Sequence, residues 1–232
     1  MTAIEASYAQ ARRSFLPPFD ETAESPYRVY DAQEVADEEC WSQISRAVDA
    51  CLRKDDWKEA LQSKSQWNTS TKKLIEKIDD PNKKGVKYLV KTVCLVQHLI
   101  RFHNRASKNF MDGSLEDVTR FLGLPYDVAN RFLALFCVPA HDRGRAGFAT
   151  SKQLKDKRVV YTLVMYLLAH GKNMKVDSVQ DICNDLRLPL KDCMMLYREA
   201  GCKCIKDKAG KVSVRLQVPI EFPGPKRGKK VA

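Results

Sequence analysis

The sequence predicts a mainly α-helical protein with small β-hairpins, in which a helical linker region precedes two similar helical units. Three observations support this fold class: long stretches with helical spacing of apolar residues, an ungapped internal repeat, and an alternating segment near the C-terminus. At 232 residues and 44% hydrophobic residues, the chain has room for one large domain or two small ones plus a linker.

Residues 1–31 are predicted to form an extended linker whose first 13 residues are frayed. Pro17, Pro18 and Pro26 favour an extended backbone and oppose helix. Aromatic side chains lie between these prolines, a pattern that suits docking along another protein; the alternative is a linker that lies on its own domain. The candidate residues for docking on a partner are Phe15, Leu16, Pro17, Pro18, Phe19, Tyr27 and Tyr30.

Residues 32–85 are predicted to form a helical linker region of short helices. Apolar residues recur with helical spacing over 32–53 and again around Trp57 and Leu74. Asn68, Thr69 or Ser70 is expected to cap the third helix, and the polar cluster at 79–82 is expected to end it. The region has few apolar residues, so we expect it to pack on something else.

A long apolar helix is predicted from Val86. Apolar residues cover more than half of its circumference, which indicates the centre of a small core. Ser114 and Asp117 resemble a capping box before a short helix to Leu122. Pro125 suits the start of the next helix, and a basic, glycine-rich stretch at 141–148 follows it.

The order of elements then repeats 64 residues later without a gap. Residues 108–127 (KNFMDGSLEDVTRFLGLPYD) align with residues 172–191 (KNMKVDSVQDICNDLRLPLK). Residues 212–218 alternate apolar and polar, as a strand with one buried face does, and 202–206 supply the partner strand. Helix, short helix, turn, helix and hairpin in about 65 residues is the winged-helix variant of the helix-turn-helix. We therefore predict winged helix 1 at 86–151, winged helix 2 at 152–222 and a basic tail at 223–232.

Positive charge is concentrated in the two units. Residues 1–80 carry 11 Lys/Arg against 16 Asp/Glu, residues 81–151 carry 11 against 5, and residues 152–232 carry 18 against 8. Such a distribution is typical of a polyanion binder, although it also suits a solvated surface. The two helices after the turns hold few side chains that read bases, so we expect DNA-backbone binding with little sequence preference. The candidate DNA-binding residues are Arg131, Arg143, Arg145, Lys152, Lys155, Lys157, Arg158, Lys191, Arg198, Lys203, Lys206, Lys208, Lys211 and Arg215.

No motif for an enzyme, a cofactor or a metal is found. The eight cysteines include no C-x-x-C pair, which favours free thiols in a reducing compartment over a zinc site. The four histidines show no triad arrangement, and phosphate-binding glycine motifs are missing. The longest apolar run is too short to span a membrane.

The strip SFLPPFDETAESPYRVYD at 14–31, the helical stretch up to Lys87 and the doubled Leu-Pro turn resemble the C-terminal part of the RNA polymerase I subunit related to TFIIE and TFIIF. The resemblance implies a nucleolar, non-catalytic factor with a linker along the polymerase cleft and a tandem winged-helix domain near upstream DNA. It also implies a role in initiation and elongation on rRNA genes. The N-terminal dimerisation domain of that subunit is not in this sequence. Contact with the dimerisation partner is therefore expected to be made by that domain and not by the residues given.

Two functions remain open at this point. One is a DNA-binding module of RNA polymerase I that contacts double-stranded DNA, with single-stranded DNA as an alternative. The other is a nuclear protein–protein scaffold whose winged helices do not touch DNA.

Overall fold

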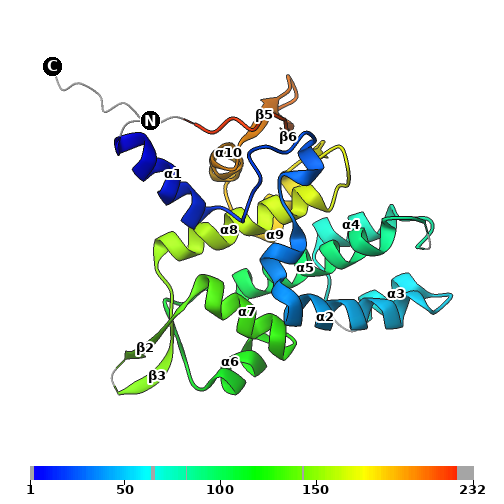
Figure 1. Ribbon diagram of the computed structural model, residues 1–232. Coiled ribbons are helices and arrows are strands. Elements are labelled where there is room, and N and C mark those ends of the chain that lie inside the picture. The colour runs from blue at the N-terminus through cyan, green and yellow to red at the C-terminus, as the bar shows by residue number, and fades with distance from the viewer. Residues whose placement is uncertain (1–2, 64–65, 82, 143, 224–232) are drawn as a thin grey trace.

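The computed structural model describes residues 3–63, 66–81, 83–142 and 144–223. Helices dominate it, and its two sheets are small, three-stranded and antiparallel (Figure 1). The predicted fold class, mainly helical with small β-hairpins in a winged-helix-like order, is confirmed. Each helix among these residues is too short or too polar to cross a bilayer. Beyond Pro223, the predicted basic tail lies outside the described residues.

The N-terminal segment is a helix, and the prediction of a frayed start is wrong. Helix α1 spans Ala3–Phe15, because its sequence is rich in Ala, Glu, Gln and Arg, which favour helix. Pro17 and Pro18 follow this helix and do not permit it to continue. A short 3₁₀ turn at Pro26–Arg28 follows, and a β-bridge pairs Phe19 with Tyr30.

The three helices predicted in the linker region are confirmed. Helix α2 kinks at Asp37, whose φ of 60° and ψ of 177° are not helical. It packs on α5 (Val86–Arg105) and α7 (Tyr126–Phe136) of the first unit. The linker helices are α2 (Ala32–Leu52), α3 (Trp57–Gln62) and α4 (Thr69–Glu76).

The first unit has the predicted helices and hairpin and one strand that was not predicted. The Ser114 hydroxyl accepts from the backbone N–H of Asp117, whose carboxylate accepts from the Ser114 N–H, as the capping box requires. The extra strand, β1, pairs with β3 to give the sheet order β1-β3-β2. The elements are α5 (Val86–Arg105), β1 (Phe110–Asp112), α6 (Leu115–Leu122), α7 (Tyr126–Phe136), β2 (Val138–Asp142) and β3 (Arg145–Ala149).

The second unit repeats this order and its sheet topology, β4-β6-β5. Strands β1 and β4 are three and two residues long, too short to show an alternating pattern in the sequence. The elements are α8 (Lys152–Leu168), β4 (Lys175–Val176), α9 (Gln180–Asp185), α10 (Leu190–Glu199), β5 (Cys202–Lys206) and β6 (Val212–Leu216).

Helix α8 lies at the centre of the molecule. All of its residues from Arg158 to Leu168 are buried. It packs on α5 and α7 of the first unit and on α10 of its own unit, so the two units share one core.

The repeat extends to backbone conformation at the turn before α7 and α10. Gly123 and Arg187, 64 residues apart, both adopt a left-handed conformation, with φ of 61° and 55°. Glycine enters this region without strain, whereas Arg187 has a Cβ that crowds the backbone. The two units therefore form the same turn, and only the second forms it under strain.

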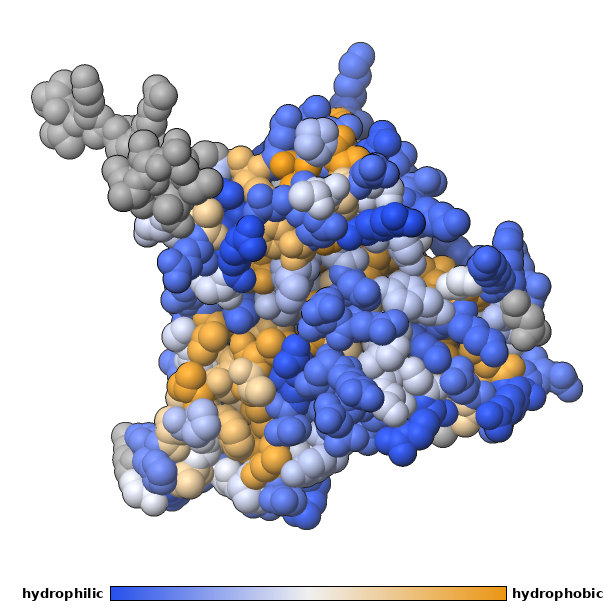
Figure 2. All heavy atoms as spheres, viewed as in Figure 1, coloured by the Kyte–Doolittle hydropathy of each residue, from blue (hydrophilic) through white to orange (hydrophobic). Residues whose placement is uncertain are grey.

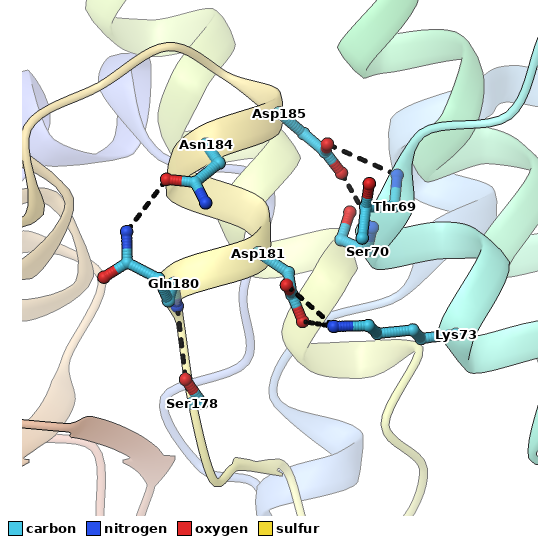
Figure 3. A network of polar contacts seen from close by, with 8 residues as sticks. All are labelled: Thr69, Ser70, Lys73, Ser178, Gln180, Asp181, Asn184 and Asp185. Carbon is cyan, nitrogen blue, oxygen red and sulfur yellow. Dashed lines mark hydrogen bonds and ion pairs between the residues drawn. The ribbon is translucent and has the colours of Figure 1, made fainter.

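A polar clamp joins α4 of the linker region to α9 of the second unit (Figure 3). The Asp185 carboxylate accepts from the backbone N–H groups of Thr69 and Ser70, at 3.3 and 2.8 Å. These groups lie in the first turn of α4, where helical N–H groups lack internal partners and the helix dipole favours an anion. Lys73 also contacts both oxygens of Asp181, at 2.9 and 2.8 Å. Asp185 therefore caps α4 from outside, whereas the N-cap Asn68 makes no side-chain cap bond.

The left-handed turn predicts opposite effects of substitution in the two units. We expect Gly123→Ala to lower the free energy of unfolding by about 1–2 kcal/mol, because it introduces a Cβ at positive φ. We expect Arg187→Gly to raise it by about 0.5 kcal/mol, because it removes that strain. Urea denaturation measures both, with Arg187→Ala as the control that removes the side chain and keeps the strain. Equal stability of Arg187→Gly and Arg187→Ala would contradict this account.

The clamp predicts that two neighbouring acids of α9 differ in importance. We expect Asp185→Ala to cost about 1–2 kcal/mol, the usual value of a helix cap. Asp181→Ala removes only the partly exposed ion pair with Lys73, so its cost is expected to stay below about 1 kcal/mol. Urea denaturation of the two variants side by side is the test, and equal losses would show that Asp185 is not acting as a cap.

Candidate nucleic-acid interface

Three cations form a row across the sheet of the second unit. Arg215 of the central strand β6 lies opposite Lys203 of β5 on one side and Lys175 of β4 on the other. Register partners in antiparallel strands share a face, and all three residues are exposed. Lys175 also pairs with Asp177 at 2.7 Å, which leaves the row positive. Like charges directly opposite each other destabilise a sheet, so this arrangement suits an anionic ligand.

The opposite face of this hairpin holds it on the core. Cys202, Val214 and Leu216 are buried there. Because side chains alternate along a strand, burial of this face directs Lys203 and Arg215 to solvent. Strand alternation in the sequence could identify these two residues, but Lys175 was missed because β4 was not predicted.

Further exposed cations lie on the second hairpin and on α10. In the described part of the chain, none of them has a carboxylate within ion-pair distance. They are Lys206, Lys208 and Lys211 of the hairpin and Lys191 and Arg198 of α10.

The first unit presents fewer available cations. Arg145 of β3 pairs with Asp112 of β1 at 3.0 Å, although its side chain is 73% exposed. Arg143 lies outside the described residues. The candidate nucleic-acid interface therefore lies mainly on the second unit.

Arg131 was predicted to contact DNA, and the structure assigns it another role. Its Nε donates to the carbonyl oxygen of Val35 at 2.8 Å, and its Nη2 donates to that of Glu34 at 3.1 Å. Asp37 completes the site with an Nε–Oδ2 distance of 3.3 Å. These groups surround the kink of α2, so Arg131 fastens the linker region to α7.

Helix α2 covers the face of α7 that corresponds to the open face of α10. Lys191 and Met195 are exposed on α10, and the residues 64 positions earlier are Asp127 and Arg131. The side chain of Gln43 on α2 accepts from the backbone N–H of Asp127 at 3.1 Å. The two units thus share a fold but differ in which face of the third helix reaches solvent.

The junction cations divide into exposed and engaged residues. Lys152 is exposed. Lys155 donates to the carbonyl of Ser107 and to the side chain of Asn109, at 2.8 and 2.9 Å. Lys157 lies half-buried with its ammonium 5.5 Å from the ring centre of Tyr161, and burial lowers its pKa.

Arg158 is only 1% exposed, so the prediction that it contacts DNA is wrong. Its guanidinium donates to the carbonyl of Ala106, the C-cap of α5, and lies 5.3 Å from the ring centre of Phe102. Burial lowers the pKa of Arg158 to about 10, so the side chain stays protonated at neutral pH. A cation at a helix C-terminus is favourable, and Arg158 therefore closes the end of α5.

His103 is the second partner of this buried guanidinium. The Nε of Arg158 donates to its Nδ1 at 3.3 Å. Burial and the charge of Arg158 lower the pKa of His103 to about 4, which keeps the ring neutral and able to accept. Sequence spacing indicated helical positions for both residues but contained no signal of their contact.

The predicted docking strip packs mostly on its own chain. Leu16, Pro17 and Tyr30 are buried, and the Tyr30 hydroxyl donates to the carbonyl of Ala200 at 3.0 Å. Phe19 and Tyr27 are half-buried against aromatic rings, Phe222 and Tyr88 respectively. Phe15 is half-buried too, and only Pro18 of the set is exposed. The strip therefore lies on its own domain, which was the alternative to docking on another protein.

The cysteines show no site of their own. All eight are free, and seven are buried. In the described residues, no group of three or more His, Cys, Asp or Glu side chains is placed to hold a metal ion.

The family model described as "A49-like RNA polymerase I associated factor" matches residues 1–223. A search of curated proteins finds no match.

The buried histidines predict a loss of stability in mild acid. Burial and Arg101 lower the pKa of His98 to about 4, as burial and Arg158 do for His103. Because both folded-state values lie below the ordinary value of about 6.5, the unfolded chain binds more protons as the pH falls. Stability from this source is complete above about pH 6.5 and is lost as the pH falls towards 4.

We therefore expect the free energy of unfolding to fall by about 2 kcal/mol per histidine between pH 7 and pH 5. Urea denaturation at both pH values measures it. His103→Gln keeps an acceptor for Arg158 and does not titrate, so the loss should shrink by about 2 kcal/mol. A variant with the full loss would exclude His103 as a cause.

Proposed function

Because the chain belongs to the A49-like family of RNA polymerase I associated factors, we propose that it binds DNA for the polymerase, through its second winged-helix unit, without catalysing a reaction. The observation that carries this proposal is the row of Lys175, Arg215 and Lys203 across one exposed sheet face. Phosphates spaced along a duplex neutralise such a row and release counterions, which is the main source of non-specific DNA affinity.

The proposed interface consists of the exposed cations on and around this sheet. It keeps those predicted residues that remain available and adds Lys175. Its members are Lys152, Lys175, Lys191, Arg198, Lys203, Lys206, Lys208, Lys211 and Arg215.

Little sequence preference is expected of this interface. On α10 the exposed side chains are Lys191, Asp192, Met195 and Arg198, which include no Asn or Gln for a bidentate contact with adenine. Apart from Lys152 at the start of α8, the remaining cations lie on the second sheet and its hairpin, where they are expected to hold phosphates. The favoured ligand is double-stranded DNA, with single-stranded DNA as the alternative.

The wider role is proposed by the same reasoning. Association with RNA polymerase I follows from the family, and action in the nucleolus during initiation and elongation on rRNA genes is the proposed setting. The units proposed for this role are winged helix 1 at 86–151 and winged helix 2 at 152–222. The second candidate function, a scaffold without DNA contact, is favoured by one observation: the first unit has few available cations.

Removing the cation row predicts weaker binding to every sequence alike. We expect the double variant Lys203→Ala/Arg215→Ala to lower the affinity for unrelated duplexes equally, because both side chains are expected to bind phosphate and neither to read a base. The slope of log K against log salt should fall by about one for each phosphate that is no longer neutralised. Fluorescence anisotropy over a salt series on two unrelated duplexes measures both quantities.

The matched control is Lys83→Ala/Lys84→Ala, which removes the same charge from the exposed loop before α5. Its salt slope should equal that of the unsubstituted chain. The proposal fails if the unsubstituted chain does not bind DNA at low salt, or if the two double variants lose affinity equally.

A further inference from the structure

The exposed positions of α7 form one uncharged stripe. They are Tyr126, Asn130 and Ala134, each four residues apart, and the exposed Val138 follows the helix at the start of β2. Residues four apart lie on one face of a helix. Tyr126 is 46% exposed and Val138 is 51% exposed. We name these four residues the α7 stripe.

A further large apolar side chain is exposed on the helix next to α7. Phe121, at the end of the neighbouring α6, is 53% exposed. Figure 2 shows hydrophobic residues gathering over α7 and the base of the β2–β3 hairpin, whereas hydrophilic residues cover most of the rest of this view. Exposed apolar residues that gather in one place mark an interaction site more often than scattered ones do.

The chemistry of the stripe opposes a nucleic-acid ligand. DNA binding depends on cations, and the stripe has none. The one basic residue of α7, Arg131, is held by Glu34, Val35 and Asp37 of α2. The same contacts hold α7 against α2, so the stripe is presented on a fixed helix.

The family of this chain is described as associated with RNA polymerase I, so a surface that binds protein is expected on the fold. The predicted docking strip is largely used inside the fold, since Leu16, Pro17 and Tyr30 are buried. We propose that the α7 stripe docks on an apolar protein surface of RNA polymerase I. This inference rests on the polymerase association and is independent of DNA binding by the second unit.

The two units would then bind different partners. The stripe faces protein, and the Lys175–Arg215–Lys203 row faces phosphate. Rigid packing around α8 fixes the relation of the two surfaces, so docking through one orients the other.

The test compares two acidic substitutions by two binding measurements. Tyr126→Asp/Val138→Asp places charge in the stripe, and Ile205→Asp places charge on the solvent face of the second wing, where Ile205 is 58% exposed. Each labelled chain is titrated with RNA polymerase I purified without this factor and, separately, with duplex DNA. Thermal melting checks that each variant is folded, and Tyr126→Ser/Val138→Thr is the milder substitute if the first pair is not.

We expect the stripe variant to bind polymerase at least tenfold more weakly and DNA within twofold of the unsubstituted chain. Ile205→Asp should show the reverse pattern. The proposal is overturned if the stripe variant binds polymerase normally, if it loses DNA affinity equally, or if the unsubstituted chain does not bind polymerase. Failure of DNA binding alone leaves the polymerase measurement intact, so the two proposals are judged separately.

Discussion

The burial of α8 on all sides is the constraint on which the rest of the structure depends. A helix with no exposed residue from Arg158 to Leu168 needs apolar neighbours around its whole circumference, and one unit alone does not supply them. Helices α5 and α7 of the first unit and α10 of the second complete the enclosure. Shared enclosure makes the units one folded body, so neither is expected to keep its structure without the other. The buried guanidinium of Arg158 also joins the two units, because it donates to the carbonyl of Ala106 at the C-terminal end of α5.

The helices, the turns and the second hairpin could be predicted because their signals are local. Apolar spacing marks α5 and α8, Ser114 and Asp117 mark the start of α6, and alternation marks β6. Each of these signals lies within about 20 residues of chain. The 64-residue repeat adds support, because the elements predicted in one unit recur in the other. Helix α1 was not predicted, because residue propensity, the main signal in this segment, is a weak one.

The site was harder to predict because availability is a tertiary property. A cation in the sequence looks the same whether it is solvated, paired or buried. Arg131, Arg158 and Lys203 are alike in the sequence, yet the first braces α2, the second caps α5 and the third faces solvent. Strands β1 and β4 were not predicted either. The position of Lys175 on β4, beside Arg215, could therefore not be predicted.

The contacts of residues 1–80 also determine when this part of the chain can complete its folding during synthesis. Chains are made from the N-terminus, but Tyr30 bonds to Ala200, Arg12 bonds to the carbonyl of Pro223, and α4 is capped by Asp185. Ribosomes add about 5–20 residues per second, so the front helices wait on the order of ten seconds for their partners to be synthesised. Mutual repulsion within residues 1–80, which carry 16 acidic and 11 basic residues, helps to keep the waiting segment soluble. Residues 1–80 are therefore made before their partners, and their folding is complete only after residues 185–223 have been synthesised.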